Sequence, residues 1–266
     1  MKNPEKVKNY IVKWLQDYTE KSALQGFVVG VSGGIDSALT STLCALTNLP
    51  VIVVEMPIHQ EKGQVNRAQE HMDWLVKNFN NVQAKSVSLT AVFEAFKDTI
   101  PATKNTEQQN LSLANTRARF RMATLYYFAA LHRYLVAGTG NKVEDFGVGF
   151  YTKYGDGGVD LSPIADLMKT EVFELAAHLG IVNSIQNAPP TDGLWDDGRT
   201  DEDQLGASYP EMEWAMEAVA SNQEVKNMTD REKHVLQLYK NHHKSNRHKM
   251  DPIPVCKIPD KLKAIF

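Results

Sequence analysis

Residues 30–37 read Gly30-Val31-Ser32-Gly33-Gly34-Ile35-Asp36-Ser37, and this stretch decides the fold that the sequence predicts. The apolar residues 27–29 precede it and the helix-like stretch 38–46 follows it, so the order along the chain is strand, glycine-rich turn and helix. Such a turn leaves backbone N–H groups free to point inward beside the positive end of the helix dipole, which suits a phosphate group. A pair of glycines alone would indicate only a capped turn. The flanking serines and Asp36 favour a phosphate-binding loop.

The type of phosphate loop follows from what the motif contains and lacks. The stretch has no Gly-Lys-Ser/Thr, which excludes the common loop of kinases and GTPases, and no Gly-x-Gly-x-x-Gly, which excludes the dinucleotide fingerprint of dehydrogenases. Residues 32–37 instead resemble the pyrophosphatase-type loop Ser-Gly-Gly-x-Asp-Ser. Enzymes with that loop cleave ATP between its α and β phosphates and transfer AMP to an oxygen of their substrate. The resemblance implies adenylation and leaves the acceptor open.

Composition limits the class of acceptor and the location. The net charge is −3, the pI is about 6.2 and the basic clusters are small, whereas an RNA-binding face must neutralise several phosphates. We therefore expect a small-molecule acceptor and no nucleic-acid partner. The two cysteines, Cys44 and Cys256, are far apart, the longest apolar stretches are strand-sized, and the polar N-terminus shows no secretory signal. These features predict a cytoplasmic protein without a membrane partner.

Strands alternate with helices through the first half of the chain. We expect strands at 26–31, 50–57, 81–89 and 134–137, and helices at 4–24, 38–46, 62–79, 90–98 and 110–133. This alternation predicts an α/β fold, with a doubly wound, mostly parallel sheet flanked by helices. Beyond residue 166 the pattern is helical and rich in loops. Because no repeat or low-complexity linker divides the 266 residues, we expect a single domain over residues 1–266.

Polar residues follow the fourth predicted strand, at the edge where a parallel sheet binds its ligands. Gly138-Thr139-Gly140-Asn141 ends that strand, and Glu144 follows. Thr139 would lie at the ligand edge, and Glu144 could face Asp36 across the phosphates, which would give Mg²⁺ two carboxylates. Glu144 could equally be a first-turn helix acid that the helix dipole stabilises. This segment alone leaves both interpretations open.

The next loop favours a functional site. Residues 151–160 read Tyr-Thr-Lys-Tyr-Gly-Asp-Gly-Gly-Val-Asp, which is too polar and flexible for a core element. Lys169 then begins an amphipathic helix pattern. Because a lysine at a helix start is unfavourable for the dipole, we predict that Lys169 meets an ATP phosphate.

With these motifs, the chain is similar to the ammonia-dependent NAD synthetase family over nearly its whole length. The similarity rests on Glu144, Lys169 and residues 32–37, 115–122, 138–141, 152–160, 190–191, 200–202, 205–206 and 248–249. It implies an adenine nucleotide alpha hydrolase-like fold with a helical C-terminal part. It also implies a ligase that forms a carbon–nitrogen bond. The implied reaction uses ATP to amidate deamido-NAD with ammonia, and it yields NAD, AMP and pyrophosphate through an adenylated nicotinate carboxylate.

The resemblance implies roles residue by residue. ATP would contact Gly30, Val31, Ser32, Gly33, Gly34, Ile35, Asp36, Ser37, Thr139, Lys169 and Thr191. Asp36 and Glu144 would hold Mg²⁺. The implied catalytic residues are Lys169, Thr191 and Asp156, of which Asp156 would position or deprotonate ammonia. Deamido-NAD would lie at the interface of a homodimer and contact Arg119, Lys153, Asp160, His248 and Lys249.

Departures from the family pattern leave two segments open. The span after Glu144 is one residue longer than expected, which leaves the register of residues 145–149 open. Asp192 stands where the family usually has alanine, which leaves the path of residues 187–200 open. We expect the loops at 187–200 and 243–260 to act as lids, and we expect adenine to lie against Met56 and residues 57–67.

Two other functions remain as alternatives. A tRNA-modifying adenylase with the same loop is disfavoured by the acidic pI and by the lack of cysteine pairs. An ATP-binding module without turnover would not explain the pairing of Asp36 with Glu144. Long members of the family carry an added glutaminase, for which 266 residues leave no room, so we expect free ammonia to be the nitrogen source.

Overall fold

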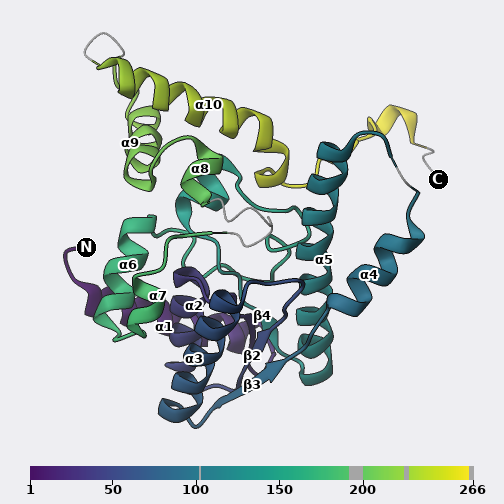
Figure 1. Cartoon of the computed structure of the whole chain (residues 1–266). Helices are drawn as coiled ribbons and strands as arrows, with labels where there is room; N and C mark the ends of the chain where they lie inside the picture. Colours follow the sequence, from purple (N-terminus) through teal and green to yellow (C-terminus); the bar gives the residue numbers. More distant parts are fainter. Residues whose placement is uncertain (102, 192–199, 225–227, 264–266) are drawn as a thin grey trace.

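A parallel sheet forms the centre of the molecule. The computed structural model describes residues 1–101, 103–191, 200–224 and 228–263. Within these residues the sheet has four strands in the order β3-β2-β1-β4, all of them parallel (Figure 1). The strands are β1 (Phe27–Gly30), β2 (Val51–Glu55), β3 (Val82–Ser86) and β4 (Leu135–Val136). Because β1 lies between β2 and β4, the winding direction reverses at β1, which makes the sheet doubly wound.

The two central strands are covered on both faces, which explains their valine-rich sequences. In the register of β1 with β2, Val28 lies opposite Ile52 and Val29 opposite Val53, and all four side chains are buried. In β3, which is one of the two edge strands among the described residues, only Val82 is buried. The end of β1 therefore lies in the most buried part of the sheet, and the phosphate loop begins there.

Helices cover both faces of the sheet. One face packs against α1 (Pro4–Ser22), α2 (Ile35–Ala45), α3 (Lys62–Asn78), α6 (Lys169–His178) and the short α7 (Asn183–Gln186). The other face packs against α4 (Thr90–Thr99) and α5 (Thr106–His132). Alternate residues of β1 and β2 contribute to the two cores, as the pleat of a strand requires.

The C-terminal part of the chain forms a helical unit with a core of its own. It contains the π-helical turn η1 (Val143–Val148), α8 (Asp201–Leu205), α9 (Tyr209–Ala220) and α10 (Asp230–Met250). In Figure 1 the helices α8, α9 and α10 lie above the sheet, and the upper end of α5 reaches the level of α8. The first turn of α6 is tied to α9, because the backbone N–H and hydroxyl of Thr170 both donate to Glu213, at 2.9 and 2.8 Å. The helical unit is thus held against the edge of the sheet where the predicted site residues lie.

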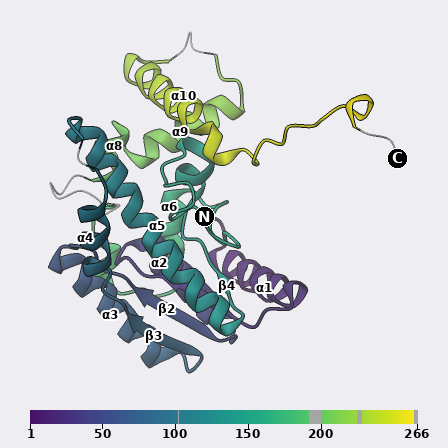
Figure 2. The same ribbon diagram turned by 90° about the vertical axis from the view of Figure 1, so that its right-hand side faces the viewer.

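The predicted fold class is confirmed, and several predicted boundaries were wrong, among them the start of α2 at Ile35 and the end of β3 at Ser86. The longest helix, α5, begins at Thr106 rather than at residue 110, because the side chain of Asn105 accepts a hydrogen bond from the N–H of Gln108 and caps its first turn. The loop expected at 243–260 begins inside α10, which continues to Met250 with three basic residues in its last turn. The short 3₁₀ turn η3 (Asp260–Leu262) follows, and residues 251–263 are exposed and extend away from the body (Figure 2).

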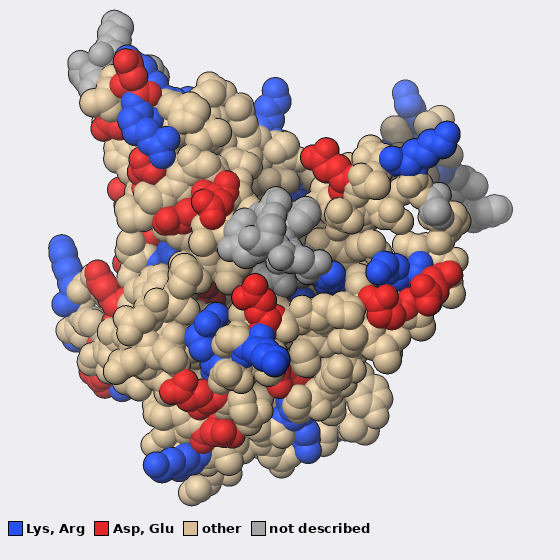
Figure 3. Space-filling view, in the orientation of Figure 1, with Lys and Arg blue, Asp and Glu red and all other residues tan. Residues whose placement is uncertain are grey.

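Among the described helices, none is long and apolar enough to cross a membrane. On the face shown in Figure 3, positive and negative side chains are interspersed over both the sheet part and the helical unit.

Candidate functional site

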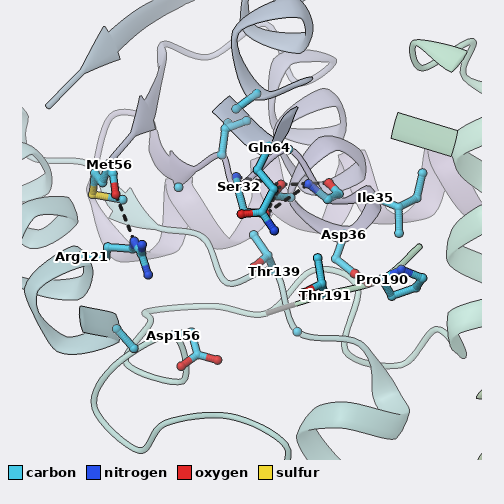
Figure 4. A pocket seen from close by; sticks show the side chains of 18 of the residues that line it. Ser32, Ile35, Asp36, Met56, Gln64, Arg121, Thr139, Asp156, Pro190 and Thr191 are labelled. Atoms are coloured by element: carbon cyan, nitrogen blue, oxygen red, sulfur yellow. Dashed lines mark hydrogen bonds between the residues drawn. The ribbon is translucent and has the colours of Figure 1, made fainter. Parts of the chain in front are cut away.

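The carboxyl ends of β1, β2 and β4 open into a cavity of about 260 Å³. All eight residues of the phosphate loop line it, together with Thr139, Glu144, Asp156, Lys169 and Thr191. Figure 4 shows Ser32, Asp36, Thr139, Asp156 and Thr191 around one common space. The structure therefore gathers every residue that was predicted to bind ATP, hold the metal or act in catalysis.

The phosphate loop has the geometry that its glycines predict. Gly33 has a φ of +82°, and a Cβ atom there would lie 2.6 Å from the carbonyl oxygen of Gln64 in α3, so only glycine fits. Gly34 precedes α2 without a side-chain cap, which leaves the first-turn N–H groups of α2 available to an anion. Ser37 stabilises the loop from within, since its hydroxyl donates to the carbonyl of Gly34 at 3.0 Å and accepts from the N–H of Ser32 at 3.2 Å.

The predicted adenine wall also lines this cavity. Met56, Pro57, Gln60, Gln64, Val65 and Arg67 all contribute to it. Arg121 of α5 holds this wall in place, because it donates to the carbonyl of Met56 at 3.1 Å and to the side chain of Gln60 at 2.7 Å (Figure 4).

Lys169 lies between the two predicted metal ligands. Its Nζ atom is 2.5 Å from Oδ2 of Asp36 and 3.0 Å from Oε1 of Glu144, and its side chain is only 3% exposed. Asn141 joins the same acids, because its amide donates to Asp36 at 3.0 Å and its Oδ1 accepts from the N–H of Glu144 at 3.1 Å. The unfavourable position of a lysine at the start of α6 is thus offset by two carboxylates.

Lys169 and Asp36 each change the pKa of the other. Burial alone would lower the pKa of Lys169, but the carboxylates of Asp36 and Glu144 outweigh that effect and raise it, so the ammonium stays charged. Burial raises the pKa of Asp36, and the ammonium of Lys169 opposes that shift. Two carboxylates against one ammonium leave a negative charge in the cavity, which favours a further cation.

Asp36 and Glu144 can bind Mg²⁺ only if phosphate oxygens of a nucleotide supply further ligands. The part of the chain that the structure describes holds no cluster of three or more His, Cys, Asp or Glu side chains that could bind a metal by itself. Mg²⁺ commonly takes one or two protein carboxylates and completes its shell with phosphate oxygens and water. Both acids already face a single cation, the Lys169 ammonium, so their donor set fits a Mg²⁺ ion that arrives with ATP.

Asp156 lies on the opposite side of the cavity from the phosphate loop (Figure 4). Its Oδ1 accepts from the backbone N–H of Thr152 at 2.9 Å, and the Thr152 hydroxyl donates to Asn115 of α5 at 2.6 Å. The carboxyl is open to the cavity, but protein surrounds it on its other sides, and this desolvation raises its pKa from 3.8 to about 6. A carboxylate with such a pKa can take up a proton near neutral pH.

Four of the residues predicted to bind deamido-NAD form one chain of contacts outside this cavity. Arg119 donates to the carbonyl of Lys153 at 3.3 Å, and Lys153 donates to the carbonyl of His248 at 2.6 Å. Lys249 donates to the carbonyls of Gly149 and Tyr151, both at 2.8 Å. These contacts tie the end of α10 to the loop that carries Asp156.

Asp160, the fifth residue predicted to bind deamido-NAD, lies apart from the other four. One of its carboxylate oxygens accepts from the hydroxyl of Tyr126 at 3.0 Å and the other from the N–H of Val136 at 2.8 Å. It also lines a second hollow, whose other residues include Trp14, Tyr18 and Phe146.

Comparison with known proteins shows to which family this arrangement belongs. The family model described as NAD synthase matches residues 7–253. The chain belongs to the NAD synthase family. An NH₃-dependent NAD⁺ synthetase of Methanosarcina acetivorans is 41% identical to it over 209 residues, which cover 77% of this chain and 78% of that protein.

Two further relatives resemble the chain over almost its whole length. The NH₃-dependent NAD⁺ synthetase of Archaeoglobus fulgidus is 36% identical over 263 residues, which cover 98% of this chain and all of that protein. Among solved structures, an NMN synthetase from Francisella tularensis superimposes with a TM-score of 0.82 at 29% identity, covering 96% of this chain and 99% of that one. The similarity to members of the NAD synthase family therefore includes both the sheet and the helical unit.

The turn η1 lies in the segment that is one residue longer than expected after Glu144. Residues 143–148 form a π-helix, which has more residues per turn than an α-helix and can therefore accommodate an extra residue. Gly149 ends the turn with a φ of +65°. The register of residues 145–149 is thereby defined, whereas Asp192 lies outside the described residues.

The π-turn places a third acid, Asp145, beside the cavity. Its carboxyl lies directly over Gly140, where any Cβ atom would collide with it. Desolvation, followed by repulsion from Glu144 and Asp156, raises its pKa from 3.8 to about 8, so it is protonated at neutral pH. No role was predicted for Asp145: the extra residue after Glu144 left the register of residues 145–149 open, and it did not indicate that a π-turn directs Asp145 inward.

We expect Asp145→Asn to change how stability depends on pH. A carboxyl whose pKa is raised on folding binds more protons in the native state than in the unfolded state, so the native state loses stability as the pH rises from about 4 to about 8. The variant removes this loss and should be more stable than the wild type by roughly 1–3 kcal/mol at pH 8, after allowance for solvent screening. Urea unfolding in the presence of a chelator, at pH 5 and pH 8, measures the effect. Asp166→Asn, at an exposed acid, is the control, and parallel pH profiles for wild type and Asp145→Asn would contradict the prediction.

Proposed function

We propose that this chain amidates deamido-NAD with ammonia in an ATP-dependent reaction that yields NAD, AMP and pyrophosphate. Its membership of the NAD synthase family supports this proposal, as does the name of its relatives, NH₃-dependent NAD⁺ synthetase. The observation that carries it is the single cavity into which the phosphate loop, the Lys169 cluster and Asp156 all open. A nucleotide bound there by its phosphates would have its α-phosphate close to a base.

The first step activates the nicotinate carboxylate, because ammonia cannot displace an oxide from it. A carboxylate oxygen of deamido-NAD attacks the α-phosphorus of ATP, and the bond to pyrophosphate breaks. The N–H groups at the start of α2 and the ammonium of Lys169 stabilise the charge that develops on the phosphates. Asp36 and Glu144 would hold Mg²⁺, which neutralises phosphate charge when bound.

The second step forms the carbon–nitrogen bond. Ammonia attacks the carbonyl carbon of the adenylate, and AMP leaves with its oxygen. Ammonium must first lose a proton, and Asp156 is the carboxylate whose raised pKa and open position suit it to accept that proton. Thr191, which also lines the cavity, is proposed to contact the departing pyrophosphate.

We also propose a homodimer whose interface completes the deamido-NAD site. Tyr10, Trp14 and Tyr18 form an exposed aromatic stripe along α1 at a spacing of four residues, and they are 74%, 37% and 38% exposed. Such a stripe is typical of a helix that packs against another chain.

Light scattering on the eluting peak of a size-exclusion column should give twice the mass of the chain, and Tyr10→Asp should shift the measured mass toward that of the monomer. A cytoplasmic location remains a prediction, which cell fractionation tests.

One assay tests the proposed reaction. The purified chain is incubated with ATP, Mg²⁺, ammonium and deamido-NAD, and we expect NAD, AMP and pyrophosphate in equal amounts. ATP binding without turnover would favour a binding module instead, and turnover that required tRNA would favour the tRNA-modifying alternative. Glutamine in place of ammonium should give little NAD, and equal rates with the two nitrogen sources would contradict the use of free ammonia.

A second candidate reaction is the amidation of nicotinate mononucleotide, which carries the same carboxylate without the AMP half. The close structural similarity to an NMN synthetase favours it. The sequence relatives favour the dinucleotide, because they are 41% and 36% identical, compared with 29% for the NMN synthetase. Comparing kcat/KM for the two acids decides between them, and we expect the larger value for deamido-NAD.

A further inference from the structure

The hydroxyl of Tyr209 contacts the same carboxylate oxygen as Lys169. It lies 2.5 Å from Oε1 of Glu144 and 3.2 Å from Oδ2 of Asp201. A phenol has one proton, and the shorter distance assigns it to Glu144. The Oε1 atom thus accepts from Tyr209 and from Lys169, which lies 3.0 Å away on the side of Asp36.

Tyr209 is itself held rigidly. It is the first residue of α9, its side chain is buried in the core of the helical unit, and its backbone N–H donates to Glu202 at 2.9 Å. Its ring also packs against Lys169, whose Nζ atom lies 4.7 Å from the ring centroid. A glutamate side chain loses considerable rotamer freedom when it is fixed, so a rigid partner that fixes it beforehand favours metal binding.

We propose that Tyr209 is a positioning residue, whose hydroxyl holds the carboxylate of Glu144 in the orientation that binds Mg²⁺ beside Asp36. The inference rests on the proposed function, because that function assigns the metal to this pair of acids. Partners that orient a metal ligand typically contribute about 10–100-fold to metal affinity. Tyr209 comes from α9, so it makes the helical unit part of the metal site.

The chain offers a matched control. Tyr239 of α10 is buried in the same core as Tyr209, at 4% and 3% exposed, and its hydroxyl makes no hydrogen bond to a described residue. Tyr209→Phe and Tyr239→Phe therefore remove the same group from the same core. Only the first removes a contact to Glu144.

The test measures metal binding directly. Mn²⁺, as a probe for Mg²⁺, is titrated into each variant by electron paramagnetic resonance in the presence of an ATP analogue that cannot be cleaved between the α and β phosphates. We expect the Kd for Mn²⁺ to rise by about 10–100-fold in Tyr209→Phe and to stay unchanged in Tyr239→Phe. In the NAD-forming assay, Tyr209→Phe should need more Mg²⁺ for half of its maximal rate, and excess Mg²⁺ should restore most of kcat. Thermal unfolding in a chelator checks that both variants are folded.

Two results would overturn the proposal. One is a Kd for Mn²⁺ in Tyr209→Phe equal to that of the wild type. The other is a reduced rate in Tyr209→Phe that excess Mg²⁺ does not restore, since a purely structural defect would behave in that way. A wild-type chain that formed no NAD would instead contradict the proposed function, and the Mn²⁺ titration would still decide the role of Tyr209.

Discussion

Asp36→Asn is expected to lower the rate of NAD formation by roughly 10³-fold or more. The substitution removes a carboxylate that lies 2.5 Å from Lys169 and that is proposed to bind Mg²⁺ with Glu144. Loss of about 4 kcal/mol of charge stabilisation at the phosphates corresponds to such a change in rate. The first step releases pyrophosphate and forms the adenylate that the second step consumes, so AMP, pyrophosphate and NAD should fall together.

The same variant should keep its fold. Asparagine has nearly the shape of aspartate, its carbonyl oxygen can still accept from Asn141, and Lys169 retains Glu144 as a partner. We therefore expect the circular dichroism spectrum of Asp36→Asn to match that of the wild type. Asp166→Asn is a suitable control, because the side chain of Asp166 is 96% exposed and pairs only with Lys142 among the described residues. A rate near that of the wild type in Asp36→Asn would refute the metal role of Asp36.

The ATP half of the site could be predicted from the sequence because its position follows from local patterns. Valine-rich strands and the turn after β1 predict a parallel sheet, and the carboxyl ends of parallel strands meet at one edge. Asp36 follows β1 and Glu144 follows β4, and these strands are neighbours in the sheet, so the two acids had to lie close together. The placement of Lys169 between them was not predicted, since its unfavourable position at a helix start led only to the prediction that it meets an ATP phosphate.

The contacts from the helical unit could not be predicted in the same way. Tyr209 and Glu144 are 65 residues apart, and their contact depends on how α9 packs against η1 and α6, which no local pattern encodes. The prediction that a loop begins at residue 243 was wrong for a related reason, since α10 continues to Met250. Its polar composition is typical of a loop, whereas contacts of Lys249 with Gly149 and Tyr151 hold its last turn in place. Sequence patterns thus predict the elements, and tertiary packing decides which polar residues reach the site.

Asp156→Asn is expected to separate the two chemical steps. Asp156 is proposed to take a proton from ammonium and has no proposed part in adenylation, so only the second step should slow, by about 10²–10⁴-fold. Exchange of labelled pyrophosphate into ATP reports the first step and should persist with deamido-NAD present. NAD formation reports both steps and should be almost lost. Equal losses in the two assays would show that Asp156 supports the fold or the nucleotide instead.

The pH profile gives an independent test of the same role. With a pKa raised to about 6, Asp156 is a carboxylate above that pH and is protonated below it, so NAD formation should fall as the pH drops through about 6. In Asp156→Asn the remaining activity should follow only the supply of unprotonated NH₃, with no inflection near pH 6, while Asp166→Asn should keep the wild-type profile. Hydroxylamine, a nucleophile that is largely unprotonated at neutral pH, should restore product formation in Asp156→Asn far better than ammonium does, because its attack needs no prior loss of a proton. An unchanged preference for ammonium would contradict a base at this position.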